Sequence, residues 1–165
     1  MEFIDVVDDH NQVIGQMAKS ELYEKKPHHR IVHVLIYNDQ GEMALQLRSA
    51  NVAFCPNHWV TTVGGHVQTG ETTEAAAKRE MMEEIGVDLP LEYVFDAEYL
   101  PPTLPGVIKF LTIYQATYNG PFSPDPNDVA KVEYFPLSEI VLMPERGERF
   151  HPELSFLLQK LTSKS

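Results

Sequence analysis

The chain has 165 residues, of which 43% are hydrophobic and 22% are charged, and this length and composition are typical of a single globular domain. Its formal net charge of −11 disfavours an extended nucleic acid as a partner, because binding a phosphate backbone needs a basic surface. A small phosphorylated substrate that arrives with a metal ion remains compatible with that charge. The single cysteine, Cys55, excludes an internal disulfide and suits a reducing compartment.

The expected location follows from the apolar runs and the N-terminal charges. No apolar run reaches the length that spans a membrane, and acidic residues stand near the N-terminus where a secretory signal carries basic ones. We therefore expect a cytoplasmic protein with no membrane partner.

The first part of the chain consists mostly of predicted strands that are separated by polar turns. The expected strands are residues 3–7, 13–17, 29–37, 43–47 and 59–63. The first two form a β-hairpin, and a helical turn is expected at residues 20–26.

The second part of the chain alternates helices and strands, with two proline-rich surface loops. We expect helices that begin after Thr72, at 138–142 and at 152–161, and strands at 92–100, 107–118 and 130–135. This interleaving predicts an α/β sandwich: a mixed sheet with helices on both faces. Residues 1–165 are expected to form one domain, with residues 1–28 as a hairpin extension packed on it.

The helix after Gly70 has clear start and stop signals. Thr72 is the expected N-cap, a run of strong helix formers follows, and Gly86 stands where a glycine ends a helix. The helical repeat places Ala77, Met81 and Ile85 on the face that packs on the core.

Three glutamates, Glu80, Glu83 and Glu84, share an arc of roughly 100° on this helix. Like charges at this spacing repel one another by a few tenths of a kcal/mol per exposed pair, a cost that no structural role requires. A hard divalent cation such as Mg2+ does require carboxylate oxygens. A solvated acidic helix face is the alternative explanation.

Residues 65–87, GHVQTGETTEAAAKREMMEEIGV, carry glycines and charges at fixed spacing around these glutamates. Gly65 is followed after five residues by Glu71, and after seven more by Arg79 and Glu80. This pattern resembles the Nudix box of the Nudix hydrolases, which cleave diphosphate linkages with a divalent metal. The resemblance implies an α/β/α sandwich of the Nudix type, Mg2+ as cofactor with Mn2+ as a substitute, and catalytic roles for Arg79, Glu80, Glu83 and Glu84.

The same resemblance implies further roles around the helix. The Gly65 carbonyl joins Glu80, Glu83 and Glu84 as a metal ligand, and Glu71 pairs with Arg79 to brace the loop. Asp128 lies in a loop where many relatives carry an additional metal-binding carboxylate, and a turn aspartate is the equal alternative.

The N-terminal half also resembles isopentenyl-diphosphate isomerase, a Nudix-fold enzyme. The resemblance implies that Lys19 and Arg48 contact a substrate diphosphate. It places His29 and His66 at metal-ligand positions. Three departures argue against the isomerase mechanism. Gly64 stands at the position of the catalytic cysteine, Glu80 replaces an arginine that binds diphosphate, and Leu22 or Tyr23 replaces a metal-binding histidine.

These observations favour Mg2+-dependent hydrolysis of a diphosphate linkage in a nucleoside-diphosphate-type or related small molecule. An isomerase-like enzyme and a ligand-sensing domain without catalysis are the alternatives. The residues that would recognise the rest of the substrate carry no sequence signature. Either a monomer or a homodimer is compatible with the sequence.

Overall fold

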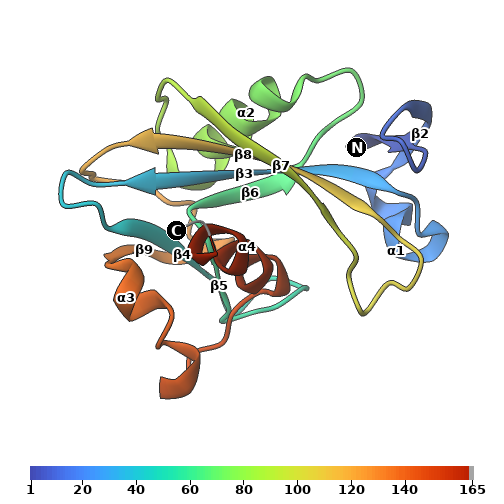
Figure 1. The fold of residues 1–165 in the computed structure, drawn as a ribbon. Helices are drawn as coiled ribbons and strands as arrows, with labels where there is room; N and C mark the ends of the chain where they lie inside the picture. The colour runs from blue at the N-terminus through green and yellow to red at the C-terminus, as the bar shows by residue number, and fades with distance from the viewer. Residues whose placement is uncertain (164–165) are drawn as a thin grey trace.

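A seven-stranded mixed sheet forms the centre of the computed structural model, which describes residues 1–163 (Figure 1). Its strands are β3 (His29–Tyr37), β4 (Met43–Arg48), β5 (Trp59–Thr61), β6 (Val63–His66), β7 (Glu92–Tyr99), β8 (Lys109–Thr117) and β9 (Val129–Phe135). The strand order is β5-β4-β3-β8-β7, while β6 pairs with β3 and β9 pairs with β4. Strands β3 and β8 run parallel, and the other pairs are antiparallel.

Helices cover both faces of this sheet, as the sequence predicts. Helix α2 (Thr73–Ile85) lies on one face, and α3 (Leu137–Ile140) and α4 (Pro152–Thr162) lie on the other (Figure 1). Successive side chains of β3 point to opposite faces of the sheet, which explains why there are two hydrophobic clusters. Val32 and Val34 pack in the cluster that includes α2, and Ile31 and Leu35 pack in the cluster that includes α3 and α4. The α/β sandwich with a mixed sheet is confirmed.

The N-terminal hairpin forms a separate two-stranded sheet at one end of the main sheet (Figure 1). It consists of β1 (Phe3–Val7) and β2 (Val13–Ala18), followed by η1 (Lys19–Glu21) and α1 (Leu22–Lys25). The Val7 amide donates to the His28 carbonyl at 3.1 Å, and the Thr69 amide donates to the Phe3 carbonyl at 2.9 Å. The first bond ties the hairpin to the residue before β3, and the second ties it to the segment that follows β6.

The expectation of one strand at residues 59–63 is wrong, because the chain turns at Thr62 from one neighbour to another. Strand β5 pairs with β4, whereas β6 pairs with β3. The Thr62 hydroxyl accepts from the Ile36 amide at 3.0 Å and donates to the Ala44 carbonyl, so it contacts both neighbouring strands at the break. The break directs Gly64 and Gly65 toward α2.

The helix expected at residues 138–142 is shorter and begins earlier than predicted. Helix α3 ends at Ile140, and a turn leads to η2 (Pro144–Arg146). Within residues 1–163, none of the helices combines the length and the apolar character that crossing a membrane requires.

Candidate functional site

Helix α2 begins and ends as its sequence predicts. The Thr72 hydroxyl accepts from the Ala75 amide at 3.1 Å, and Gly86 ends the helix with φ of +69°. A Cβ at Gly86 would lie 2.9 Å from the Ser123 carbonyl oxygen, so the loop of residues 121–128 packs against the helix end. In that loop, the Asp125 amide donates to the Glu84 carbonyl at 3.1 Å.

Gly65 allows β6 to approach α2 closely enough to touch Glu80. A Cβ at position 65 would lie 2.3 Å from Cδ of Glu80, which is closer than side-chain atoms approach one another. The position of the Glu80 carboxylate therefore depends on a glycine at residue 65. This contact brings the Gly65 backbone and the Glu80 carboxylate together.

Arg79 links the loop before α2 to the carboxylates of the helix. Its Nε donates to Glu71 Oε2 at 2.7 Å and its Nη2 to Glu71 Oε1 at 2.9 Å, which is a bidentate pair. Its Nη1 donates to Glu80 at 2.9 Å and to Glu83 at 3.2 Å, and Nη2 also reaches the His66 carbonyl at 3.1 Å. One guanidinium thus fixes three carboxylates and the end of β6.

Glu84 lies beside Glu80 on α2, and burial raises its pKa well above the ordinary value. The neighbouring Glu80, by hydrogen bond and by charge, raises this pKa further. Gln46 Nε2 donates to Glu84 Oε1 at 2.8 Å and to the Thr62 carbonyl at 3.1 Å. Such a site favours a bound cation, because a cation offsets the charge of two crowded carboxylates.

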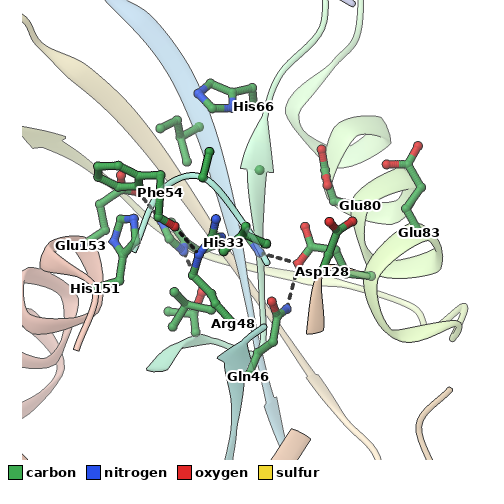
Figure 2. Close-up of a pocket in the computed structure, with 18 of the residues that line it drawn as sticks. His33, Gln46, Arg48, Phe54, His66, Glu80, Glu83, Asp128, His151 and Glu153 are labelled. Atoms are coloured by element: carbon green, nitrogen blue, oxygen red, sulfur yellow. Dashed lines mark hydrogen bonds and ion pairs between the residues drawn. The ribbon is translucent and has the colours of Figure 1, made fainter. Parts of the chain in front are cut away.

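A cavity of about 840 Å3 lies between α2 and the start of α4. Figure 2 shows Glu80, Glu83 and Asp128 on one side of it and His151 and Glu153 on the other. The acidic side chains on the α2 side are Glu80, Glu83, Glu84, Asp125 and Asp128. Asp128 therefore lies on the same side as the helix glutamates, and its carbonyl accepts from the Ser49 amide at 2.9 Å.

The opposite wall carries a buried set of charged groups. His33 Nε2 contacts Glu153 Oε1 at 2.8 Å, and Lys109 Nζ donates to Glu153 Oε2 at 2.9 Å. Burial alone would raise the pKa of Glu153, but the hydrogen bond from His33 and the charges of His33 and Lys109 outweigh it and lower that pKa strongly. His33 Nδ1 lies 2.7 Å from the Thr61 hydroxyl.

The predicted substrate contacts, Lys19 and Arg48, both line the cavity. Lys19 Nζ pairs with Glu2 at 3.0 Å, and Arg48 Nε donates to the Phe54 carbonyl at 2.8 Å. Arg48 thereby also holds the loop that carries Phe54 at the cavity.

His29 and His66 stack with ring centroids 5.5 Å apart. Burial lowers the pKa of His29, and it lowers the pKa of His66 to about 3, with the nearby His29 adding to the effect. His29 Nδ1 contacts the Pro27 carbonyl at 3.0 Å, while its buried Nε2 has no hydrogen-bond partner within residues 1–163. The nearby Leu22 side chain is buried and brings no polar ligand.

Several residues of the cavity carry no signal in a sequence motif. His33 could have been noticed, because it is a polar residue on the strand face that also presents Ile31 and Leu35. Lys109, as a charge at the start of an apolar strand, is a weaker signal. Glu153 offers none, since an acidic residue in the first turn of a helix is ordinary.

The donor set on the α2 side fits Mg2+ in its chemistry. All its members offer oxygen, which Mg2+ prefers, and Gly65 leaves the space that a side chain would fill. In the described part of the chain, no three His, Cys, Asp or Glu side chains converge closely enough to hold an ion by themselves. Mg2+ commonly keeps several waters and binds one or two carboxylates together with substrate phosphates, so a preformed cage is not required.

Comparisons with known proteins agree with this geometry. The family model described as NUDIX domain matches residues 27–158. A Nudix hydrolase of a Nostoc species is 33% identical over 162 residues, which cover 96% of this chain and 95% of the relative. An isopentenyl-diphosphate Delta-isomerase of Photorhabdus laumondii is 30% identical over 125 residues, 76% of this chain and 70% of the relative.

Among solved structures, the crystal structure of a Deinococcus radiodurans protein has a TM-score of 0.82 and 26% sequence identity, and the match covers 96% of this chain and 98% of that one. The family model spans the whole sheet, α2 and most of α4. The Nostoc relative matches over nearly its full length. The chain therefore belongs to the Nudix hydrolase family.

Proposed function

We propose that the protein hydrolyses a diphosphate linkage in a small-molecule substrate and depends on Mg2+. The observation that carries this proposal is the contact between Gly65 and Glu80 beside a cavity whose α2 side carries four further acidic side chains, Glu83, Glu84, Asp125 and Asp128. Relatives named Nudix hydrolases support the reaction class.

Glu80, Glu83, Glu84 and the Gly65 carbonyl would hold the ion, with Asp128 as a further carboxylate. When bound, Mg2+ supplies charge neutralisation for the diphosphate and activation of water for attack on phosphorus. Arg79 keeps Glu80 and Glu83 in place through bonds of 2.9 and 3.2 Å. Glu80, held in this way at the cavity, accepts the proton of the attacking water.

Lys19 and Arg48, which line the same cavity, contact the diphosphate. Both are cations, and the Arg48 guanidinium uses only Nε for a hydrogen bond within residues 1–163. The remaining guanidinium donors suit phosphate oxygens. We expect a cytoplasmic enzyme that acts on a nucleoside-diphosphate-type or related compound as a monomer or homodimer.

The test is a hydrolysis screen with and without Mg2+ across nucleoside-diphosphate sugars, dinucleoside polyphosphates, oxidised nucleoside triphosphates, nicotinamide dinucleotides and isoprenoid diphosphates. Release of phosphorylated products that requires the metal is the expected result. A folded protein that binds one of these compounds and cleaves none of them would instead be a ligand-sensing domain.

An isomerase-like activity is the second candidate, because one relative is named an isopentenyl-diphosphate isomerase. Protonating and deprotonating carbon needs an acid and a base across the alkene. Gly64 offers no thiol at the expected position, and a Cβ there would already lie 3.2 Å from His33 Nδ1. We expect no deuterium in dimethylallyl diphosphate when isopentenyl diphosphate is incubated with the protein in deuterated water. Incorporation at enzyme-like rates would replace the hydrolase proposal with the isomerase.

A further inference from the structure

The wall of the cavity opposite α2 holds a buried ion cluster that the proposed hydrolysis does not use. Lys109, His33 and Glu153 are 8%, 5% and 4% exposed, and all three line the cavity. Removing such charges from water is unfavourable, and apolar residues of similar volume often stabilise a fold as well or better. A role in binding explains their presence at a cavity more directly than a role in stability.

His33 links Thr61 to Glu153 through its two ring nitrogens. The Thr61 hydroxyl lies 2.7 Å from His33 Nδ1 and 3.0 Å from the Val63 carbonyl oxygen. His33 Nε2 faces the Glu153 carboxylate at 2.8 Å, and a carboxylate only accepts. His33 thus helps to hold the Glu153 carboxylate in place, and Lys109 is the charged partner of that carboxylate.

Lys109 has hydrogen-bond donors to spare. An ammonium has three N–H donors, and within residues 1–163 its one hydrogen-bond partner is Glu153 Oε2, at 2.9 Å. Both oxygens of Glu153 are occupied, one by His33 and one by Lys109. Lys109 thus brings to this end of the cavity a positive charge and donors that have no protein acceptor within residues 1–163, and these fit a group that is anionic and rich in acceptors.

The cluster also lies near the α2 carboxylates. Gly64 pairs with His33 across strands β6 and β3, and its amide lies 3.5 Å from Glu84 Oε1. A single residue of β6 therefore separates the two walls. A diphosphate compound held beside α2 can reach the opposite wall without leaving the cavity.

We propose that Lys109, positioned by Glu153 and His33, binds a phosphate oxygen of the substrate at the end of the cavity away from the α2 carboxylates. This inference rests on the proposed function for the identity of the ligand as a phosphate compound. Arg48 lines the same cavity and adds a second cation. A tetrahedral phosphate group offers oxygens in several directions, which suits donors that come from β4 and β8. A planar carboxylate offers fewer, so the phosphate is the ligand to which we commit.

The first experiment uses the wild-type chain with 15N-labelled lysine, inorganic phosphate as the probe and no Mg2+. NMR of the lysine ammonium groups should show a saturable shift of the Lys109 signal with phosphate, and Lys109→Arg identifies that signal by its absence. Sodium acetate at equal ionic strength should not shift the Lys109 signal. If the Lys109 signal does not shift with phosphate, the proposal is overturned. If acetate shifts the signal as much as phosphate does, the choice of phosphate is overturned.

The second experiment measures phosphate affinity by calorimetry in variants. Lys109→Met/Glu153→Gln removes one charge of each sign, which avoids an unpaired buried carboxylate, and we expect affinity to fall roughly tenfold or more. Lys109→Arg should retain most of the affinity, and Lys160→Met, an exposed lysine on α4, is the matched control. A folded double variant with unchanged affinity overturns the proposal.

Neither measurement requires Mg2+ or turnover. Intact phosphate binding without any hydrolysis in the substrate screen would refute the proposed function and leave the role of Lys109 standing. Hydrolysis with no response at Lys109 would do the reverse.

Discussion

Both walls of the cavity carry charged side chains, but these side chains are distributed differently along the sequence. The α2 wall is drawn mainly from one stretch, residues 65–87, and its loop and helix are joined by a pair only eight residues apart, Arg79 and Glu71. The opposite wall joins His33 to Glu153 across 120 residues and Lys109 to Glu153 across 44. Spacing in sequence therefore identifies the first wall, whereas only the folded chain brings the second together.

The walls also differ in how their charges are balanced. On the α2 side, Arg79 is the one cation that contacts Glu71, Glu80 and Glu83 within residues 1–163, and Glu84 lies beside Glu80 with a raised pKa. On the opposite side, Lys109 and His33 both contact one carboxylate, that of Glu153, whose pKa is lowered. The first wall is suited to bind a cation and the second an anion, so the cavity is polarised along its length.

Apart from changes to the α2 carboxylates themselves, the largest expected effect comes from adding a methyl group at the α2 wall. Gly65→Ala places Cβ 2.3 Å from Glu80 Cδ and must displace that carboxylate. We expect turnover to fall by about a hundredfold or more, since a displacement of about 1 Å at a reacting group has this effect. Gly15→Ala is the control, because its Cβ would meet no atom within 4 Å. Equal kcat values for the two variants would show that Glu80 placement does not matter.

A smaller loss is expected when the brace of this wall is weakened. Arg79→Lys keeps the charge but removes the bidentate pair with Glu71, whose bonds measure 2.7 and 2.9 Å. We expect activity or Mg2+ affinity to fall roughly 10- to 100-fold, as for other residues that orient metal ligands. Steady-state kinetics across a Mg2+ titration measure both quantities. Lys78→Met, on the same helix, should behave as wild type, and an Arg79→Lys enzyme with wild-type kinetics would refute the bracing role.

The sequence predicts α2, its caps and its acidic face because each depends on residues within a few turns of one another. Thr72 and Gly86 act locally, and Glu80, Glu83 and Glu84 lie on one helix. The break at Thr62 could not be predicted, because it depends on bonds to Ile36 and Ala44 from two other strands. The ion cluster around Glu153 escapes prediction for the same reason.

Replacing Glu84 with glutamine is expected to stabilise the fold at neutral pH, although it should lower activity. Burial and the adjacent Glu80 raise its folded-state pKa above the ordinary 4.5, so its favourable contribution is complete below pH 4.5 and is lost as pH rises toward the folded pKa. Without Mg2+, Glu84→Gln should therefore melt higher than wild type at neutral pH, by on the order of a few °C, and the two should converge near pH 4.5. Thermal denaturation in chelator checks this, and a variant less stable at neutral pH would contradict the crowding of charge at this wall.

The smallest expected effect concerns His151 on the opposite wall. Burial lowers its pKa from 6.5 to about 4, although the charge of Glu153 acts in the other direction. The unfolded chain then binds a proton that the folded chain does not, so stability falls as pH drops from 6.5 to about 4. His151→Asn keeps an N-cap acceptor for α4, where His151 Nδ1 accepts from the Glu153 amide at 3.1 Å, and removes the titration.

The melting temperature of His151→Asn should consequently decline less between pH 7 and pH 4 than that of wild type, by roughly a degree or two. Parallel declines in the two proteins would mean that His151 does not contribute to acid sensitivity.

The most direct test of the central claim is hydrolysis in 18O-labelled water by the wild type and by Glu84→Gln, with and without Mg2+. Using a substrate found in the screen, 31P NMR reports whether the label reaches phosphorus. We predict labelled phosphate products only with Mg2+, and a rate in Glu84→Gln that is lower by a few orders of magnitude, because a charged metal ligand is lost. Label incorporation at the wild-type rate in folded Glu84→Gln with saturating Mg2+ would contradict the assignment of the α2 carboxylates as the catalytic metal site.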